Sequence, residues 1–192
     1  MQKLHNELLA GAGSLSRMQP PTLRTSRLVL EPLSDRHSDG MFELWSAAEV
    51  CEHSGPAKDW NGHEIILPAV HADCSDRLID FFVRLAEMDR GFRWAAIEAA
   101  SGEFAGALGF NSLGARPELA YHQVPRFWGR GLMSEACRAA LDWAQAHGAK
   151  DVVAFVDQAN SRSAKLIERL GFCKSNDVRE GAECYVLASS TS

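Results

Sequence analysis

The most informative stretch of the sequence is Val124-Pro-Arg-Phe-Trp-Gly-Arg-Gly-Leu-Met-Ser-Glu-Ala136. Within it a strand ends, a loop with two glycines turns, and a helix begins. The start of a helix presents unpaired backbone N–H groups and the positive end of the helix dipole, which suit an anion such as a pyrophosphate. Gly129 and Gly131 remove side chains where backbone must approach phosphates, and Arg126 and Arg130 add positive charge. An ordinary glycine turn with solvated arginines has the same composition, so the loop alone leaves both interpretations open.

The segments around the loop predict a mixed α/β sheet. Apolar stretches on either side of Ala100-Ser-Gly-Glu103 are typical of an antiparallel hairpin. Apolar residues at three-to-four spacing after the loop predict a helix that ends at Gly148. The predicted order is a strand at residues 28–30, a helix at 34–45, a partly helical stretch at 64–88 that Pro68 breaks or begins, strands at 92–99, 104–111 and 119–124, a helix at 132–147, a strand at 151–156, a helix at 161–170, and short strands near 172 and at 184–187.

Composition favours one globular domain and argues against several classes of protein. The 192 residues are 46% apolar, which is enough to bury a core. Twenty Lys and Arg residues against 25 Asp and Glu residues give a net charge of -5, which argues against a nucleic-acid partner. No apolar run reaches the roughly 18 residues of a membrane span. The five cysteines form no CxxC pair, which favours a reducing, cytoplasmic setting.

The first 21 residues differ in character from the rest. They contain few β-branched or aromatic residues and end in Pro20-Pro21, so we expect a flexible N-terminal extension at 1–21 and a single domain at 22–192. Met18 as the natural start is a further hypothesis, which would place residues 1–17 outside the native protein.

Three blocks of sequence resemble one enzyme family. Arg126-x-x-Gly129-x-Gly131 at a strand-to-helix junction resembles the pyrophosphate-binding signature of the GNAT N-acetyltransferases. Asn160-x-x-Ser163-x-x-x-x-Glu168-x-x-Gly171-Phe172 is similar to that family's segment after the fifth strand. Arg27-Leu-Val-Leu-Glu-Pro-Leu33 is similar to the opening strand of its ribosomal-protein (RimJ/RimL) branch. The blocks cover roughly residues 22–189, which is specific for the family and much less so for a substrate.

The resemblance implies a fold and a cofactor site. It implies a mostly antiparallel sheet of about seven strands, flanked by about four helices and splayed between the fourth and fifth strands, at 119–124 and 151–156. The pantetheine arm of acetyl-CoA, the acetyl donor, would enter this opening, where unpaired strand edges supply hydrogen bonds. The implied cofactor-binding residues are Gln123, Val124, Arg126, Phe127, Trp128, Gly129, Arg130, Gly131, Leu132, Met133, Asn160 and Ser163.

The resemblance also implies catalytic candidates. Many members of the family place an acidic tyrosine in the helix after Asn160, but Ile167 occupies that position here. Ser163 matches a serine of the RimJ/RimL branch and is our candidate for the donor of a proton to the thiolate, or for positioning the sulfur. A serine that satisfies N–H groups in the first turn of a helix is the structural alternative.

For the base, Glu118 lies in Glu-Leu-Ala-Tyr, which is similar to a strand motif of that branch, and strand alternation puts it on the same face as His122. Either residue would deprotonate the amine directly or through water, and a solvent-facing carboxylate at a strand start is the alternative for Glu118. Glu180 and Glu183 are further candidates, in or beside a short connection at 176–182. We expect no metal, since His63-Glu64 is not followed by a second histidine at zinc-helix spacing.

Two other functions fit parts of the pattern. A dinucleotide-binding enzyme would explain a glycine loop before a helix, but Ser134 replaces the third glycine and only 35 residues follow Asp157. A catalytically silent acyl-CoA-binding or regulatory module of the same fold is the other alternative, because Ile167 replaces the tyrosine and no base is unambiguous.

The sequence does not identify the amine that accepts the acetyl group. A protein N-terminus and a small-molecule amine are both compatible with the motifs, and no nucleic-acid or membrane partner is expected. A homodimer is plausible for the family, although no residue demonstrates one.

Overall fold

The computed structural model describes residues 20–179 and 181–188, so residues 1–19 of the extension predicted at 1–21 and Glu180 lie outside the described residues. Ten described strands form sheets of five, three and two strands, in the orders β1-β2-β5-β6-β7, β8-β10-β9 and β3-β4. The strands are β1 Leu23–Arg24, β2 Leu28–Pro32, β3 Ala57–Lys58, β4 Glu64–Ile65, β5 Phe92–Glu98, β6 Phe104–Phe110, β7 Leu119–Gln123, β8 Asp151–Asp157, β9 Cys173–Arg179 and β10 Ala182–Ala188. The helices are η1 Asp35–His37, α2 Ser38–Ser46, α3 Ala48–Cys51, α4 Ala72–Glu87, η2 Pro125–Phe127, α5 Leu132–Ala146 and α6 Ser161–Arg169.

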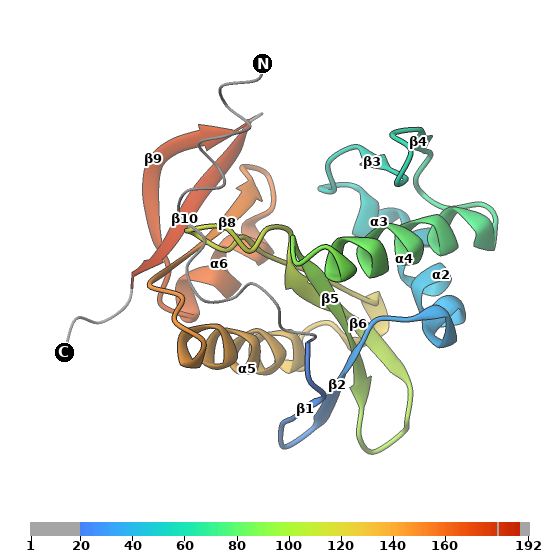
Figure 1. The fold of residues 1–192 in the computed structure, drawn as a ribbon, viewed down its shortest axis with the longest axis horizontal. Coiled ribbons are helices and arrows are strands. Elements are labelled where there is room, and N and C mark those ends of the chain that lie inside the picture. The colour runs from blue at the N-terminus through green and yellow to red at the C-terminus, as the bar shows by residue number, and fades with distance from the viewer. Residues whose placement is uncertain (1–19, 180, 189–192) are drawn as a thin grey trace.

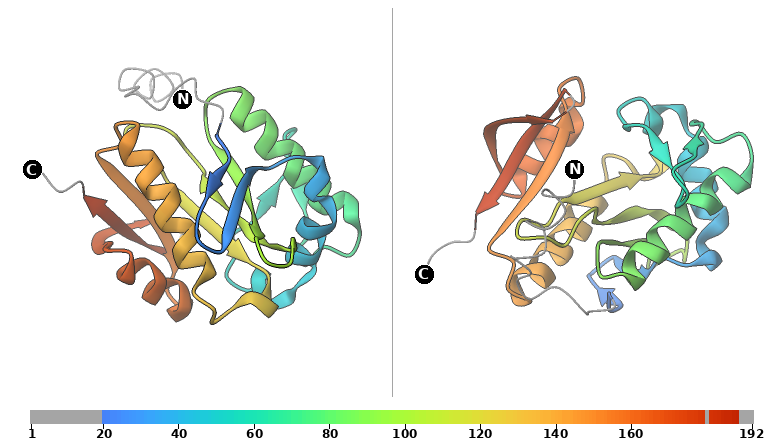
Figure 2. Two further views of the ribbon diagram at one scale, coloured as in Figure 1. Left: turned by 90° about the horizontal axis from the view of Figure 1, so that it is seen from below. Right: turned by 45° about the horizontal axis from the view of Figure 1, so that its top comes forward.

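Helices cover both faces of the five-stranded sheet. Helix α5 packs on one face, while α2 and α4 contact β6 and β5 from the other (Figures 1 and 2). Strand β6 is buried along its whole length and β5 nearly so, which explains why both read as continuous apolar runs instead of alternating ones. The predicted mixed α/β architecture is confirmed.

An aromatic cluster fixes α5 on the sheet. Trp143 of α5 meets Phe92 and Trp94 of β5 edge to face, with ring centroids 5.4 and 5.5 Å apart. Phe110 of β6 completes the cluster, and Phe92, Trp94 and Phe110 are at most 1% exposed. Edge-to-face pairs add roughly 0.5–1.5 kcal/mol each beyond the burial of their surface. This packing anchors the helix whose first turn follows the glycine loop.

The sheet opens between β7 and β8. One isolated parallel bridge joins Glu118 to Val153, and the Val153 N–H donates to the Pro117 carbonyl at 2.9 Å. Beyond this point the described strands form no ladder between β7 and β8, since β7 pairs with β6 and β8 pairs with β10. The predicted splay between these two strands is therefore confirmed.

Several element boundaries differ from the prediction. Helix α4 begins at Ala72, four residues after Pro68, so the proline precedes the helix instead of interrupting it. Five α-helices are described where about four were expected, because α3 is a single turn that carries no periodic signal. Strand β9 runs to Arg179 and β10 begins at Ala182, so most of the expected connection at 176–182 is strand. Strand β9 lies at a sheet edge and is largely exposed, which removes the apolar alternation that would have predicted its length.

The backbones of β6 and β7 approach each other closely at Gly106, and substitution of this residue tests that packing. A Cβ atom at this position would overlap the carbonyl oxygen of His122 and lie 2.9 Å from the Cα of Gln123. We expect Gly106→Ala to lower the free energy of unfolding by about 1 to 3 kcal/mol or more, because partner backbone must move. Denaturant unfolding measures this, with Gly114→Ala as control, since a Cβ there meets nothing within 4 Å. Equal stability of the two variants would contradict the prediction.

Candidate active site

The glycine loop forms a cradle of free backbone donors. Gly129 and Gly131 both have φ of 74°, in the left-handed region that favours glycine. The first N–H of α5 bonded to the loop is that of Glu135, which donates to the Gly131 carbonyl at 3.2 Å. Among the described residues, the N–H groups of 129–134 donate no hydrogen bond. Six consecutive free donors at a helix N-terminus suit the oxygens of a pyrophosphate.

The side chains around the cradle contribute less charge than their number suggests. Arg126 pairs with Glu43 at 3.1 Å and with Glu103 at 3.4 Å. Arg130 pairs with Glu98, and its guanidinium lies over the Phe127 ring. Both arginines are therefore neutralised by carboxylates, so the attraction for an anion comes mainly from the backbone and the helix dipole.

Four of the expected binding residues contribute backbone but no side chain. Val124, Phe127, Leu132 and Met133 are at most 3% exposed and pack into the core. Their side chains hold the loop against the sheet, which leaves the main chain facing outward. This arrangement agrees with a site built from peptide groups.

Trp128 lies at the end of β7, beside the opening in the sheet. Its indole N–H donates to the Gln123 carbonyl at 2.8 Å, and the Gln123 amide donates to the Phe127 carbonyl at 3.0 Å. The guanidinium of Arg162, from α6, lies 4.8 Å from the Trp128 ring centre. The tryptophan thus occupies the Gln123 carbonyl, and through Arg162 it connects the two sides of the opening.

Ser163 and Asn160 divide their roles at the start of α6. The Asn160 side chain accepts from the Ser163 N–H at 3.0 Å, so the asparagine caps the helix. The Ser163 hydroxyl instead lies 2.7 Å from the Tyr121 hydroxyl of β7, across the opening. Burial raises the pKa of Tyr121, which keeps its phenol protonated. The two hydroxyls therefore join β7 to the first turn of α6 across the opening.

Glu118 is held in a polar chain on the other face of the sheet. Its carboxylate accepts from the Asn111 amide at 2.6 Å and from the Arg179 guanidinium at 2.7 Å. Arg93 donates to the Asn111 side-chain oxygen, and its guanidinium lies 4.2 Å from the Phe82 ring centre. The residue is 8% exposed, so its carboxylate is buried and ionically paired, not free in solvent.

His122 follows Glu118 on the same face, as strand alternation predicts. Its ring packs 4.5 Å from the ring of Trp45 in α2. Burial, with a smaller contribution from the nearby Arg93 charge, lowers the pKa of His122 to about 3. The imidazole is therefore neutral at physiological pH and weakly basic.

The candidate residues approach the opening from opposite faces. Tyr121 alternates with His122 along β7, so its side chain points toward α6 while His122 points toward α2. Ser163 therefore lies on the α6 side, and Glu118 lies on the α2 side. Tyr121 is the residue that sequence reasoning missed, although it is the last residue of the Glu-Leu-Ala-Tyr motif.

The remaining candidates lie apart from this arrangement. Glu183 of β10 accepts from Lys174 at 2.6 Å and from the Tyr185 hydroxyl at 3.3 Å. Ile167, at the position of the family's common tyrosine, is fully buried in the core. No group of three or more metal-ligating side chains gathers within the described part of the chain. In that same part, no helix has the length and apolar character needed to cross a membrane.

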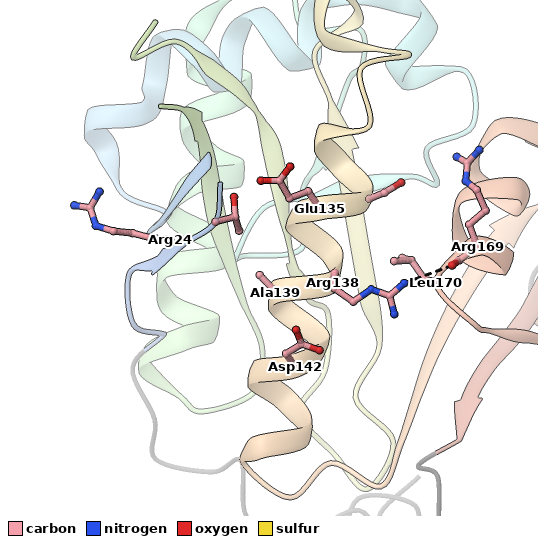
Figure 3. Close-up of a pocket in the computed structure, with 9 residues that line it drawn as sticks. Arg24, Glu135, Arg138, Ala139, Asp142, Arg169 and Leu170 are labelled. Carbon is pink, nitrogen blue, oxygen red and sulfur yellow. Dashed lines mark hydrogen bonds between the residues drawn. The ribbon is translucent and has the colours of Figure 1, made fainter. Parts of the chain in front are cut away.

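A separate shallow groove of about 530 Å³ runs along the outer side of α5 (Figure 3). Arg24 flanks it on one side, and Arg138 and Arg169 flank it on the other. Arg138 reaches the Arg169 carbonyl at 3.4 Å, which ties α5 to the end of α6. None of the twelve residues expected to bind the cofactor lines this groove.

Comparison with known proteins identifies the family. A family model described as "Acetyltransferase (GNAT) domain" matches residues 27–173. The chain belongs to this family of GNAT acetyltransferases. The uncharacterized N-acetyltransferase YoaA of Bacillus subtilis is 28% identical over 164 residues, which cover 83% of this chain and 87% of that protein.

Solved structures show the same fold. An acetyltransferase from Agrobacterium tumefaciens superposes with a TM-score of 0.71 at 22% identity, covering 90% of this chain and 96% of that one. The ribosomal L7/L12 α-N-protein acetyltransferase RimL, solved with coenzyme A, gives a TM-score of 0.68 at 16% identity, covering 86% and 96%. The chain thus shares its fold with both acetyltransferases, one of which was solved with coenzyme A.

The lowered pKa of His122 predicts acid sensitivity. The unfolded chain binds a proton near pH 6.5 and the folded chain near pH 3, so this group stabilises the fold above pH 6.5. That stability is lost as the pH falls, by up to about 2 kcal/mol between pH 7 and pH 5. Urea unfolding at both pH values should show a smaller loss for His122→Gln than for the parent. The exposed His71→Gln variant is the control, and an unchanged pH dependence in His122→Gln would refute the assignment.

Proposed function

We propose that this protein is an acetyl-CoA-dependent N-acetyltransferase of the RimJ/RimL-like branch, which moves an acetyl group to a primary amine by direct attack on the thioester. The observation that carries the proposal is the run of free N–H groups at 129–134, placed at the mouth of an opened sheet. Family membership and a relative solved with coenzyme A support it. The competing dinucleotide-binding function lacks the parallel sheet that such a fold requires.

The residues fit the acetyl donor in two places. The cradle at 129–134 supplies donors for the pyrophosphate, and Arg162 is an exposed cation near Trp128 that pairs with no carboxylate among the described residues. The unpaired edges of β7 and β8 supply peptide groups for the amides of the pantetheine arm, with Asn160 close by. The Trp128 indole must turn away from the Gln123 carbonyl when the arm enters.

Ser163 is proposed to hold or protonate the departing sulfur. The Tyr121 phenol lies within hydrogen-bond distance of its hydroxyl, so the Ser163 proton is free to point toward the opening when the tyrosine donates. In this proposal a pair of hydroxyls, one from β7 and one from α6, takes the place of the family's tyrosine, whose position Ile167 occupies. A positioned acid contributes roughly a hundredfold or more in rate.

Glu118 is proposed as the base that takes the proton from the amine. Asn111 and Arg179 each donate to one carboxylate oxygen, and each oxygen keeps a lone pair for the ammonium or for a bridging water. Its position opposite Ser163 lets the amine arrive on one face of the opening while the sulfur leaves on the other. His122 is the weaker candidate because of its lowered pKa.

The setting and the acceptor are also proposals. The free cysteines of the described chain agree with a cytoplasmic enzyme. The acceptor is a small-molecule amine or a protein N-terminus, and we propose neither a nucleic acid nor a membrane as partner. A homodimer stays possible, and sedimentation would establish it.

Acetyl-CoA binding tests the cradle. We expect the parent to bind in a calorimetric titration and the Gly129→Val, Gly131→Val double variant to bind about tenfold more weakly or worse, because a β-branched residue disfavours a positive φ. Gly102→Val is the matched control, since Gly102 has the same φ of 74° and open space around it, yet lies in the β5–β6 turn. A parent that fails to bind acetyl-CoA would overturn the proposed function.

Turnover tests the catalytic assignments. Ser163→Ala and Glu118→Gln should each lower kcat about a hundredfold, through loss of a positioned acid and a positioned base. Release of free thiol from acetyl-CoA measures the rate, and Ser161→Ala, an exposed serine of the same helix, is the control. Changes of only a few-fold would refute the two assignments while the enzyme class stands. Acetyl-CoA binding without turnover of any amine would favour the silent module.

A further inference from the structure

A chain of four polar side chains runs from the β7–β8 junction into the five-stranded sheet, on the face that α2 and α4 cover. It runs from Arg179 to Glu118 at 2.7 Å, on to Asn111 at 2.6 Å, and ends at Arg93. The residues come from β9, from the position just before β7, from the position just after β6 and from β5. Tertiary folding therefore places one guanidinium group against the Glu118 carboxylate and connects a second one to it through Asn111, on the face where an acceptor amine would arrive.

The charges in this chain do not balance. Arg93 is 4% exposed, and no described carboxylate lies within 4 Å of it. Burial lowers the pKa of Arg93 only to about 10, so it keeps its charge at neutral pH. His122 beside it is neutral, and Asp157 at the end of β8 is occupied by His53 at 3.5 Å. The four polar side chains therefore carry a net charge of +1, from Arg93 and Arg179 against Glu118.

Arg179 is the accessible end of this chain. Its guanidinium lies 3.7 Å from the ring centre of Phe155 in β8 and reaches Glu118 beside β7, so it spans the two strands of the opening. The Arg179 side chain is 52% exposed, whereas that of Glu118 is 11% exposed. A ligand on this face would contact Arg179 first, with the carboxylate directly behind it.

We propose that the acceptor is a zwitterionic small molecule, an α-amino acid or a close analogue, whose amine lies one or two atoms from a carboxylate. This inference rests on the proposed function. A side-by-side guanidinium and carboxylate is complementary to such a molecule, because Arg179 binds the substrate carboxylate in bidentate geometry and Glu118 receives the ammonium.

Charge balance favours this class over other amines. The reactive form of the acceptor has a neutral amine, so an amino acid in this form carries a net charge of -1. This charge is opposite to the +1 of the four polar side chains. A polyamine or an aminoglycoside adds further positive charge to a buried arginine, which is unfavourable in a partly desolvated site. A protein N-terminus lacks the adjacent carboxylate and leaves Arg179 without a new partner.

The reaction is balanced by the same residues. The ammonium loses one proton through Glu118 to solvent, and the amine nitrogen forms the new N–C bond as the C–S bond breaks. The second nitrogen proton is also lost to solvent. The sulfur leaves as a thiol with a proton supplied through Ser163, and solvent then returns a proton to the serine. One proton is released for each amide formed.

Matched pairs of acceptors test the proposal. With the full chain and acetyl-CoA, we would measure kcat/KM by thiol release for the twenty common amino acids and for their α-carboxamides, with spermidine and kanamycin as polycations. At least one amino acid should exceed its own amide by tenfold or more. Arg179→Met should reduce that ratio toward one, mainly through KM, and Arg179→Lys should keep part of it. Arg90→Met is the control, because Arg90 is an exposed arginine two residues before β5.

The outcomes separate this inference from the proposed function. Amides or polycations acetylated as well as or better than the amino acids would overturn the zwitterion proposal and leave the N-acetyltransferase in place. An unchanged acid-to-amide ratio in Arg179→Met would also overturn it. Failure to acetylate any amine, including peptides with free N-termini, would defeat the proposed function itself. Thermal unfolding of each variant shows whether a loss of rate reflects a loss of fold.

Discussion

The arrangement of this protein depends on one hydrogen-bonded junction between two strands. The Val153 N–H reaches the Pro117 carbonyl, Glu118 bridges Val153, and beyond that point β7 and β8 separate. A buried backbone group without a partner costs free energy, so two unpaired edges inside a sheet are stable only if another molecule or solvent satisfies them. The opening is thus a constraint on the fold as well as a place for a ligand.

The surrounding structure maintains that opening. The aromatic cluster at Trp143 holds α5 on one face, and the buried side chains of the loop turn its peptide groups outward. Across the opening, Tyr121 meets Ser163 on one face and Arg179 meets Glu118 on the other. The Arg179–Glu118 contact links the two sheets, and the Tyr121–Ser163 contact links β7 to α6, so side chains connect the two sides of the opening where the backbones do not.

Much of the fold was predictable because its signals are local. These signals depend on neighbours within a few residues. They are the glycines at 129 and 131 before a helix with apolar periodicity, the hairpin turn at residues 100–103, and the helix stops at Gly148 and Gly171. The prediction failed for β9, an exposed edge strand, and for the single turn of α3, since neither produces a periodic apolar pattern. The run of free N–H groups at 129–134 was predictable for a related reason, because two glycines before a helix are a local signal and the groups belong to the backbone.

Glycine placement and hydrophobic periodicity predicted the element order and a loop of free N–H groups before a helix, and the resemblance of three sequence blocks implied the family and the opened sheet. Which side chains meet depends on tertiary folding, which brings Tyr121 to Ser163, 42 residues away, and Glu118 to Arg179, 61 residues away. It also paired Arg126 and Arg130 with carboxylates, so their charge is not left free for phosphates. These partners depend on which strand edges come together, and no local spacing in a single sequence records that.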